Sequence, residues 1–135
     1  MPATEDLPPA IPGRLFEMSY TKPGDLARIR AFVRAHAGDL GLPEIRADLL
    51  TLAVCELATN TLQHTAGGGR VRLHAEPGRL LCDVIDQGPM RALGRAMPAA
   101  DALRGRGLAI VERLCDEVGI SAEDGGTRVR LMLLL

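Results

Sequence analysis

The chain has 135 residues, the size of one ordinary domain, and its 47% hydrophobic and 24% charged composition is that of a folded globular protein. A formal net charge of -1 supplies no basic field for nucleic acid or an anionic membrane surface. The 2% aromatic content also removes stacking platforms for single-stranded nucleic acid. Three separated cysteines and the absence of a long apolar run predict a reduced, cytoplasmic protein with no membrane segment.

Hydrophobic periodicity and glycine or proline breaks divide the chain into elements. Four prolines predict a flexible tail over residues 1–13, and residues 14–135 are predicted to form a single domain. The predicted elements are a strand at 15–20, helices at 23–41 and 43–65, a hairpin at 70–85, a helix at 107–116 and a hairpin at 118–134. Runs of strands set apart from helices predict an α+β two-layer sandwich, whose mixed, mainly antiparallel sheet has helices on one face.

The second predicted helix carries an unusual polar pair. At 100° per residue, the apolar Ile45, Leu49 and Leu52 share one line with Glu56 and Asn60. If this stripe faces the core, Glu56 points toward the protein or a cleft. A buried carboxylate without a partner costs several kcal/mol, roughly, so this position needs a partner, a ligand or water. An internally paired or solvated patch at the helix end is the simpler interpretation of these two residues alone.

Three glycine-containing segments follow. Asp86-Gln87-Gly88 ends a strand, where a carboxylate beside a glycine can accept a hydrogen bond from an amine of a flat ligand, although most such triplets are turns. Gly105-Arg106-Gly107-Leu108 opens a helix, and bare N–H groups at a helix start favour an anion. Gly125-Gly126-Thr127 enters the last strand, as a hairpin turn would. The irregular residues 87–104 are typical of a binding loop.

Taken in order, these segments resemble the boxes of the histidine kinase-like (GHKL) ATPase family, which has the Bergerat ATP-binding fold, over roughly Leu15 to Leu135. The small size and the phrases Cys55-Glu56-Leu57-Ala58-Thr59-Asn60 and Gly105-Arg106-Gly107-Leu108 look most like the anti-sigma factor serine/threonine kinases. The resemblance covers nearly all of the predicted domain.

The resemblance implies a role for each matching residue. Asn60 would place its amide oxygen on Mg²⁺, and Glu56 would act as the catalytic base. Asp86 would accept from the adenine amino group, Gly88 would let the ring approach, and Thr127 would help to fix the base. Gly105, Arg106 and Gly107, followed by Leu108, would bind the phosphates of ATP, and residues 87–104 would form the ATP lid.

The function implied by the resemblance is transfer of the γ-phosphoryl group of ATP to a Ser or Thr of an anti-anti-sigma factor, with a sigma factor as the second partner. The alternative is a non-catalytic module of the same fold that sequesters a sigma factor or another regulator; Pro89, where the family usually has a glycine nearby, favours it. A phosphotransfer domain of a sensor kinase is disfavoured because His64 lies at a helix end. A homodimer is compatible with the family, with the apolar carboxyl-terminal strand as a candidate sheet edge.

Overall fold

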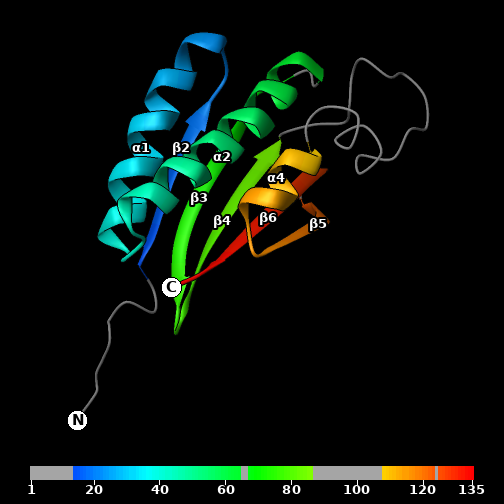
Figure 1. Cartoon of the computed structure of the whole chain (residues 1–135). Coiled ribbons are helices and arrows are strands. Elements are labelled where there is room, and N and C mark those ends of the chain that lie inside the picture. The colour runs from blue at the N-terminus through cyan, green and yellow to red at the C-terminus, as the bar shows by residue number, and fades with distance from the viewer. Residues whose placement is uncertain (1–13, 65–66, 87–107, 124) are drawn as a thin grey trace.

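The computed structural model describes residues 14–64, 67–86, 108–123 and 125–135 (Figure 1). They form a sheet and a set of helices. In chain order the elements are β2 (Leu15–Tyr20), the 3-10 turn η2 (Pro23–Asp25), α1 (Leu26–Asp39), α2 (Glu44–His64), β3 (Gly69–Glu76), β4 (Arg79–Asp86), α4 (Leu108–Leu114), β5 (Glu117–Glu123) and β6 (Gly126–Leu134).

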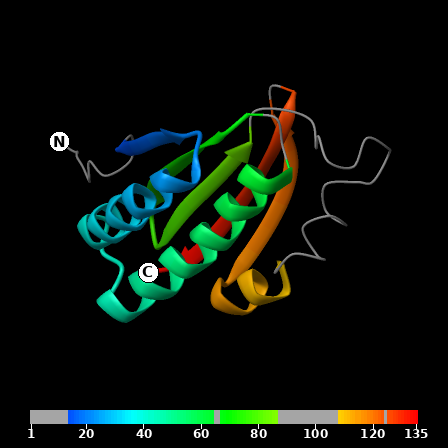
Figure 2. The ribbon, with the colours of Figure 1, turned by 90° about the horizontal axis from the view of Figure 1, so that it is seen from above.

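The sheet has five strands in the order β2-β3-β4-β6-β5, and every neighbouring pair is antiparallel. The helices α1, α2 and α4 lie on one face of the sheet, and no described helix covers the other, open face (Figure 2). The predicted α+β two-layer sandwich is therefore confirmed, with an antiparallel rather than mixed sheet among the described strands. The carboxyl-terminal strand β6 lies between β4 and β5, so its prediction as a sheet edge is wrong.

The first helix begins and ends near the boundary residues that the sequence indicated. The carboxylate of Asp25 accepts hydrogen bonds from the backbone N–H groups of Thr21, at 2.9 Å, and Lys22, at 3.3 Å, just before α1 begins. At the other end Gly41 has a φ of 105°, a left-handed conformation that glycine adopts without steric cost. These two residues set the length of α1 and hence where α2 starts.

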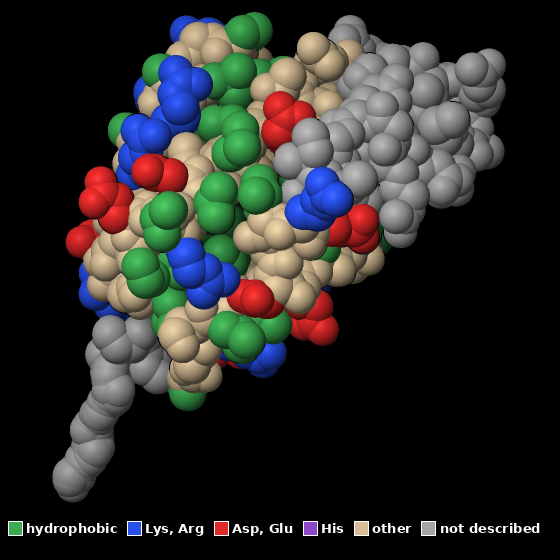
Figure 3. Space-filling model, in the orientation of Figure 1, with side chains coloured by type: hydrophobic (Ala, Val, Ile, Leu, Met, Phe, Trp, Pro, Cys, Tyr) green, Lys and Arg blue, Asp and Glu red, His purple; other side chains and the backbone are tan. Residues whose placement is uncertain are grey.

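The face of α2 that meets the core is not the one that the sequence predicted. Ile45, Leu49 and Leu52 are 71%, 39% and 50% exposed, so the expectation that this stripe is buried is wrong. The buried face instead carries Leu50 and Leu57, with small apolar residues around them. Because α2 has apolar residues on both sides, periodicity alone could not select the inner one. Figure 3 shows hydrophobic side chains along the outward face of the helical layer.

The hydrophobic core lies between the sheet and the inner faces of the helices. Tyr20, Leu73 and Leu131 are among its largest fully buried side chains. Cys82 is also fully buried there, and burial raises the pKa of its thiol well above the usual range. Among the described helices, none combines the length and apolar character needed to cross a membrane.

Candidate functional site

One cross-strand row at the end of the sheet brings together residues from four strands. Tyr20 pairs with Gly69, and Gly69 pairs with Asp86. The register of β4 with β6 places Ile85 opposite Arg128, so Thr127 lies opposite Asp86 in the same row. Side chains alternate along strands, and these positions share the parity of core residues such as Val84. The row therefore faces the helical layer.

The carboxylate of Asp86 is oriented by the last strand. Its Oδ1 accepts a hydrogen bond from the backbone N–H of Thr127, at 3.1 Å. Both residues are half-buried. The structure thus brings together two of the predicted site residues, Asp86 and Thr127, which are far apart in the sequence.

Gly126 provides the space for this contact. A Cβ atom at Gly126 would lie 2.2 Å from the carbonyl oxygen of Asp86 and 2.7 Å from its Oδ1. Contacts this short force the backbone to shift, so the close approach of β6 to Asp86 requires glycine. Sequence reasoning assigned Gly126 only to a turn, although a glycine directly before a site residue was a signal for such a contact.

The polar pair predicted on α2 lies in the carboxyl-terminal half of that helix. Asn60 is 6% exposed and Glu56, one turn earlier, is half-buried. The chain continues from the end of α2 into Gly69, the partner of Asp86, so this half of the helix and the Asp86 row belong to the same end of the sheet. Asn60 is thus buried and Glu56 partly exposed, although the stripe that precedes them faces outward.

The remaining predicted site residues fall mostly outside the described part of the chain. Gly88, Gly105, Arg106, Gly107 and the loop at residues 87–104 all lie there. Leu108 is the first residue of α4, which falls within the predicted helix at residues 107–116. Of the predicted phosphate-binding residues, the structure therefore describes only Leu108, where α4 begins.

The side-chain oxygens of Asn60 and Glu56 on α2 suit Mg²⁺. Among the described residues, no three His, Cys, Asp or Glu side chains are grouped closely enough to hold a metal ion. Mg²⁺ usually retains waters and is bound through one or two protein oxygens together with substrate phosphates. A buried amide at Asn60 with a carboxylate one turn away fits that requirement, whereas it would not fit a metal held only by protein ligands.

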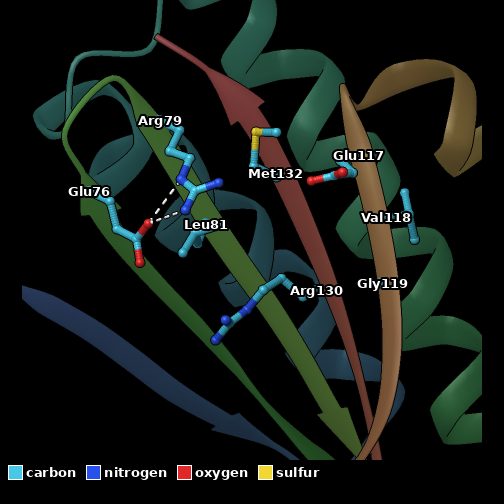
Figure 4. A pocket seen from close by; sticks show the side chains of 8 residues that line it. All are labelled: Glu76, Arg79, Leu81, Glu117, Val118, Gly119, Arg130 and Met132. Carbon is cyan, nitrogen blue, oxygen red and sulfur yellow. Dashed lines mark hydrogen bonds and ion pairs between the residues drawn. The ribbon is translucent and has the colours of Figure 1, made fainter.

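The open face of the sheet is organised by ion pairs around a buried carboxylate. Asp83 is completely buried, and Arg130 binds both of its oxygens, at 2.7 and 2.9 Å. Beside this pair is a hollow of about 330 Å³ (Figure 4), lined by Glu76, Arg79, Leu81, Glu117, Val118, Gly119, Arg130 and Met132. None of these residues is a predicted site residue. The arginines at its rim are already paired, Arg79 with Glu76 and Arg130 with Asp83.

Two residues of the Asp86 row were missed by sequence reasoning. Tyr20 was assigned only to a strand, and Gly69 only to the glycine run that stops the preceding helix. A Cβ atom at Gly69 would lie 2.2 Å from the carbonyl oxygen of Ile85, so this glycine also permits close packing of β3 on β4. The one tyrosine of the chain, placed at the end of an amphipathic strand, was the available signal.

Comparison with known proteins agrees with this arrangement. The sequence profile of the family described as "Histidine kinase-like ATPase domain" matches residues 20–133. A solved structure of the RsbU and RsbW domains of Rv1364c from Mycobacterium tuberculosis superposes with a TM-score of 0.69 at 20% identity, which shows a common fold. The match covers 90% of this chain, and the chain spans about a third (32%) of the length of that one. The curated proteins gave no significant match.

Proposed function

Because this chain belongs to the histidine kinase-like ATPase domain family, we propose that it binds ATP with Mg²⁺ and phosphorylates a regulatory protein. The γ-phosphoryl group passes to a Ser or Thr hydroxyl of an anti-anti-sigma factor, and ADP leaves. When it is not transferring phosphate, the chain sequesters a sigma factor. Phosphoryl transfer depends mainly on positioning and charge neutralisation, so a base, a metal ligand and anion-binding amides are sufficient parts.

The observation that carries this proposal is the orientation of Asp86 by Thr127. An ionised carboxylate accepts several hydrogen bonds, so Asp86 can hold the Thr127 N–H and also accept from the exocyclic amino group of adenine. Guanine carries a carbonyl oxygen at that ring position, which would repel the carboxylate. The proposed site therefore selects adenine over guanine.

The residues of α2 act at the other end of the nucleotide. Asn60 would supply an oxygen ligand for Mg²⁺, which when bound would neutralise charge on the phosphates. Glu56 accepts the proton of the attacking hydroxyl, and its half-buried position leaves it within reach of a substrate. Gly105, Arg106 and Gly107 are proposed to bind the phosphates ahead of α4, and Gly88 to let the adenine ring approach the backbone.

The regulatory assignment rests on likeness. The structure that the chain resembles contains a domain named RsbW. A protein partner is favoured because the net charge of -1 gives no attraction for nucleic acid.

The direct test is transfer of labelled phosphate from ATP to a candidate anti-anti-sigma factor. Glu56→Gln should bind ATP normally and lose transfer by about 10²–10⁴-fold, the usual contribution of a general base. Glu44→Gln, an exposed carboxylate in the first turn of the same helix, is the matched control and should retain transfer. Transfer by Glu56→Gln at the wild-type rate would contradict the assignment. ATP binding without transfer by the wild type would favour the non-catalytic module.

A further inference from the structure

The outward side of α2 carries a stripe of large apolar side chains that the core does not use. Ile45, Leu49 and Leu52 are all exposed and lie on one line of the helix. The stripe extends about 10 Å along the helix, because each residue advances the helix by about 1.5 Å. Contiguous apolar surface of this kind, bordered by polar side chains, is typical of a site that another protein covers.

Helix α1 lies beside this stripe and presents small side chains on the same outer side. The two helices run antiparallel (Figure 1), and Arg34 of α1 pairs with Asp48 of α2 at 2.9 Å. A hollow of about 830 Å³ between them is lined in part by Ala31, Ala35 and Gly38 of α1. Because these residues lack bulky side chains, another helix can approach α1 closely. We call this outer surface, the α2 stripe together with the small residues of α1, the α1–α2 face.

The two ends of the α1–α2 face carry opposite charges. Arg30 lies one helical turn before Arg34, and because the helices are antiparallel it stands beside the part of α2 that follows Asp48. Glu44 lies one turn before Asp48, toward the other end of the face. Both Arg30 and Glu44 are exposed, and neither forms an ion pair with another described residue. Figure 3 shows basic side chains at the upper left of this face and acidic side chains below them.

The apolar part of the α1–α2 face is complementary to a second copy of itself. A two-fold axis that lies across both helices at the level of Leu49 reverses the direction of the second copy's helices. Leu49 then meets Leu49 of the second copy, and Ile45 meets Leu52, because these two lie four and three residues from the axis on opposite sides. Ala31 of α1 meets Ala35 of the second copy in the same way, so the small residues also face each other.

The same axis brings the oppositely charged ends together. Arg30 of each copy meets Glu44 of the other, because each lies about one turn from the Arg34–Asp48 pair, toward opposite ends of the face. A two-fold axis along the helices would instead place Arg30 beside Arg30, where like charges repel. The charges and the apolar stripe therefore select one and the same arrangement, in which every contact occurs twice.

We propose that the α1–α2 face is the interface of a reversible homodimer in which the helices of the two copies pack antiparallel. The inference goes beyond the proposed function and does not rest on it. Each copy contributes three large apolar side chains to the contact, which makes a small interface. Small interfaces are typical of weak association, so the dimer should dissociate on dilution.

Exchanging the charges of Arg30 and Glu44 tests this arrangement on the full chain. Sedimentation velocity over a wide range of protein concentration gives the mass and the dissociation constant of the dimer. The wild type should approach twice the mass of one chain as its concentration rises. Arg30→Glu and Glu44→Arg should each raise the dissociation constant at least about tenfold, because like charges then meet at both ends of the interface.

An equimolar mixture of the two charge variants separates this interface from a loss of fold. In a mixed dimer, Glu at position 30 of one chain meets Arg at position 44 of the other, and the native Arg30 meets the native Glu44. The mixture should therefore form a heterodimer with about the affinity of the wild-type dimer, although neither variant associates well alone. Only folded chains can restore the contact in this way.

The apolar stripe is tested by a matched pair of serine substitutions. Ile45→Ser removes the most exposed residue of the stripe and should also raise the dissociation constant at least about tenfold. Leu15→Ser is the control, because Leu15 is 52% exposed but lies in β2, outside the α1–α2 face. It should leave the dimer unchanged.

Three results would overturn the inference. A wild-type chain with the mass of one copy at every concentration would mean that the α1–α2 face does not bind a second copy and is left to a different partner. A dimer that persists unchanged in Ile45→Ser and in both charge variants would form through another surface. Charge variants that fail to associate when mixed would mean that Arg30 and Glu44 do not meet across the two-fold axis.

Discussion

Asp86 Oδ1 accepts a hydrogen bond from the backbone N–H of Thr127, at 3.1 Å, across 41 positions of sequence. This contact ties the end of β4 to the beginning of β6, two neighbouring strands of the sheet. It orients a half-buried carboxylate at the end of the sheet to which the chain runs from α2, the helix that carries Glu56 and Asn60. The proposed adenine recognition depends on this orientation.

Gly126→Ala should disturb Asp86 directly. The added methyl group would meet the Asp86 carbonyl oxygen at 2.2 Å, so the backbone of β6 must move away. Overpacking of this kind costs roughly 1–3 kcal/mol in the free energy of unfolding. We expect that loss in urea denaturation, together with weaker ATP binding by calorimetry.

Gly119→Ala is the control for this substitution. Gly119 lies in the neighbouring strand β5, and a Cβ atom there would meet nothing within 4 Å. Its stability and ATP affinity should match the wild type. If Gly126→Ala behaved like Gly119→Ala in both measurements, the close approach of β6 to Asp86 would not matter to the site.

Two adjacent leucines of α2 test which face of that helix meets the core. Leu50 is completely buried and Leu49 is 39% exposed. Leu50→Ala should lower the free energy of unfolding by about 2–5 kcal/mol, and Leu49→Ala by less than about 1 kcal/mol. Urea denaturation measures both. Equal losses in the two variants would contradict the orientation of α2 described above.

The stability contributed by Asp25 should depend on pH in a defined window. Hydrogen bonds from the Thr21 and Lys22 backbone and from Arg28 hold the pKa of Asp25 below its usual value of 3.8. A carboxyl group whose pKa is lower in the folded than in the unfolded chain stabilises the fold at pH values above its unfolded-state pKa. This stabilisation is lost as the pH falls through the folded-state pKa. The difference in unfolding free energy between wild type and Asp25→Asn should therefore be constant near neutral pH and shrink below pH 3.8. A difference independent of pH down to acid unfolding would contradict it.

The elements whose period or boundary residues are unambiguous were predictable. The two hairpins were predicted from alternation and turn residues, and they appear as β3–β4 and β5–β6. Helix α1 lies between Asp25 and Gly41, as its boundary residues indicated. Local residue preferences determine such elements, so they can be predicted from the sequence alone.

The inner face of α2 and the Asp86 row were not predictable in the same way. Ile45 and Leu50 are both large aliphatic residues of one helix, yet one is 71% exposed and the other completely buried. The choice depends on how α2 rests on the sheet, which is tertiary information. The contact of Gly69 with the Tyr20 ring likewise depends on strand register, which periodicity does not determine.

The central claim is that Asn60 joins a magnesium ion to the phosphates of ATP. Calorimetric titration with ATP, in Mg²⁺ and again in a chelator, measures it on wild type, Asn60→Ala and the exposed control Gln63→Ala. Melting temperatures without ligand identify any loss of fold, since Asn60 is buried. Mg²⁺ should strengthen ATP binding to wild type and Gln63→Ala, and should give no gain to Asn60→Ala. The same gain from Mg²⁺ in a folded Asn60→Ala protein would contradict the account.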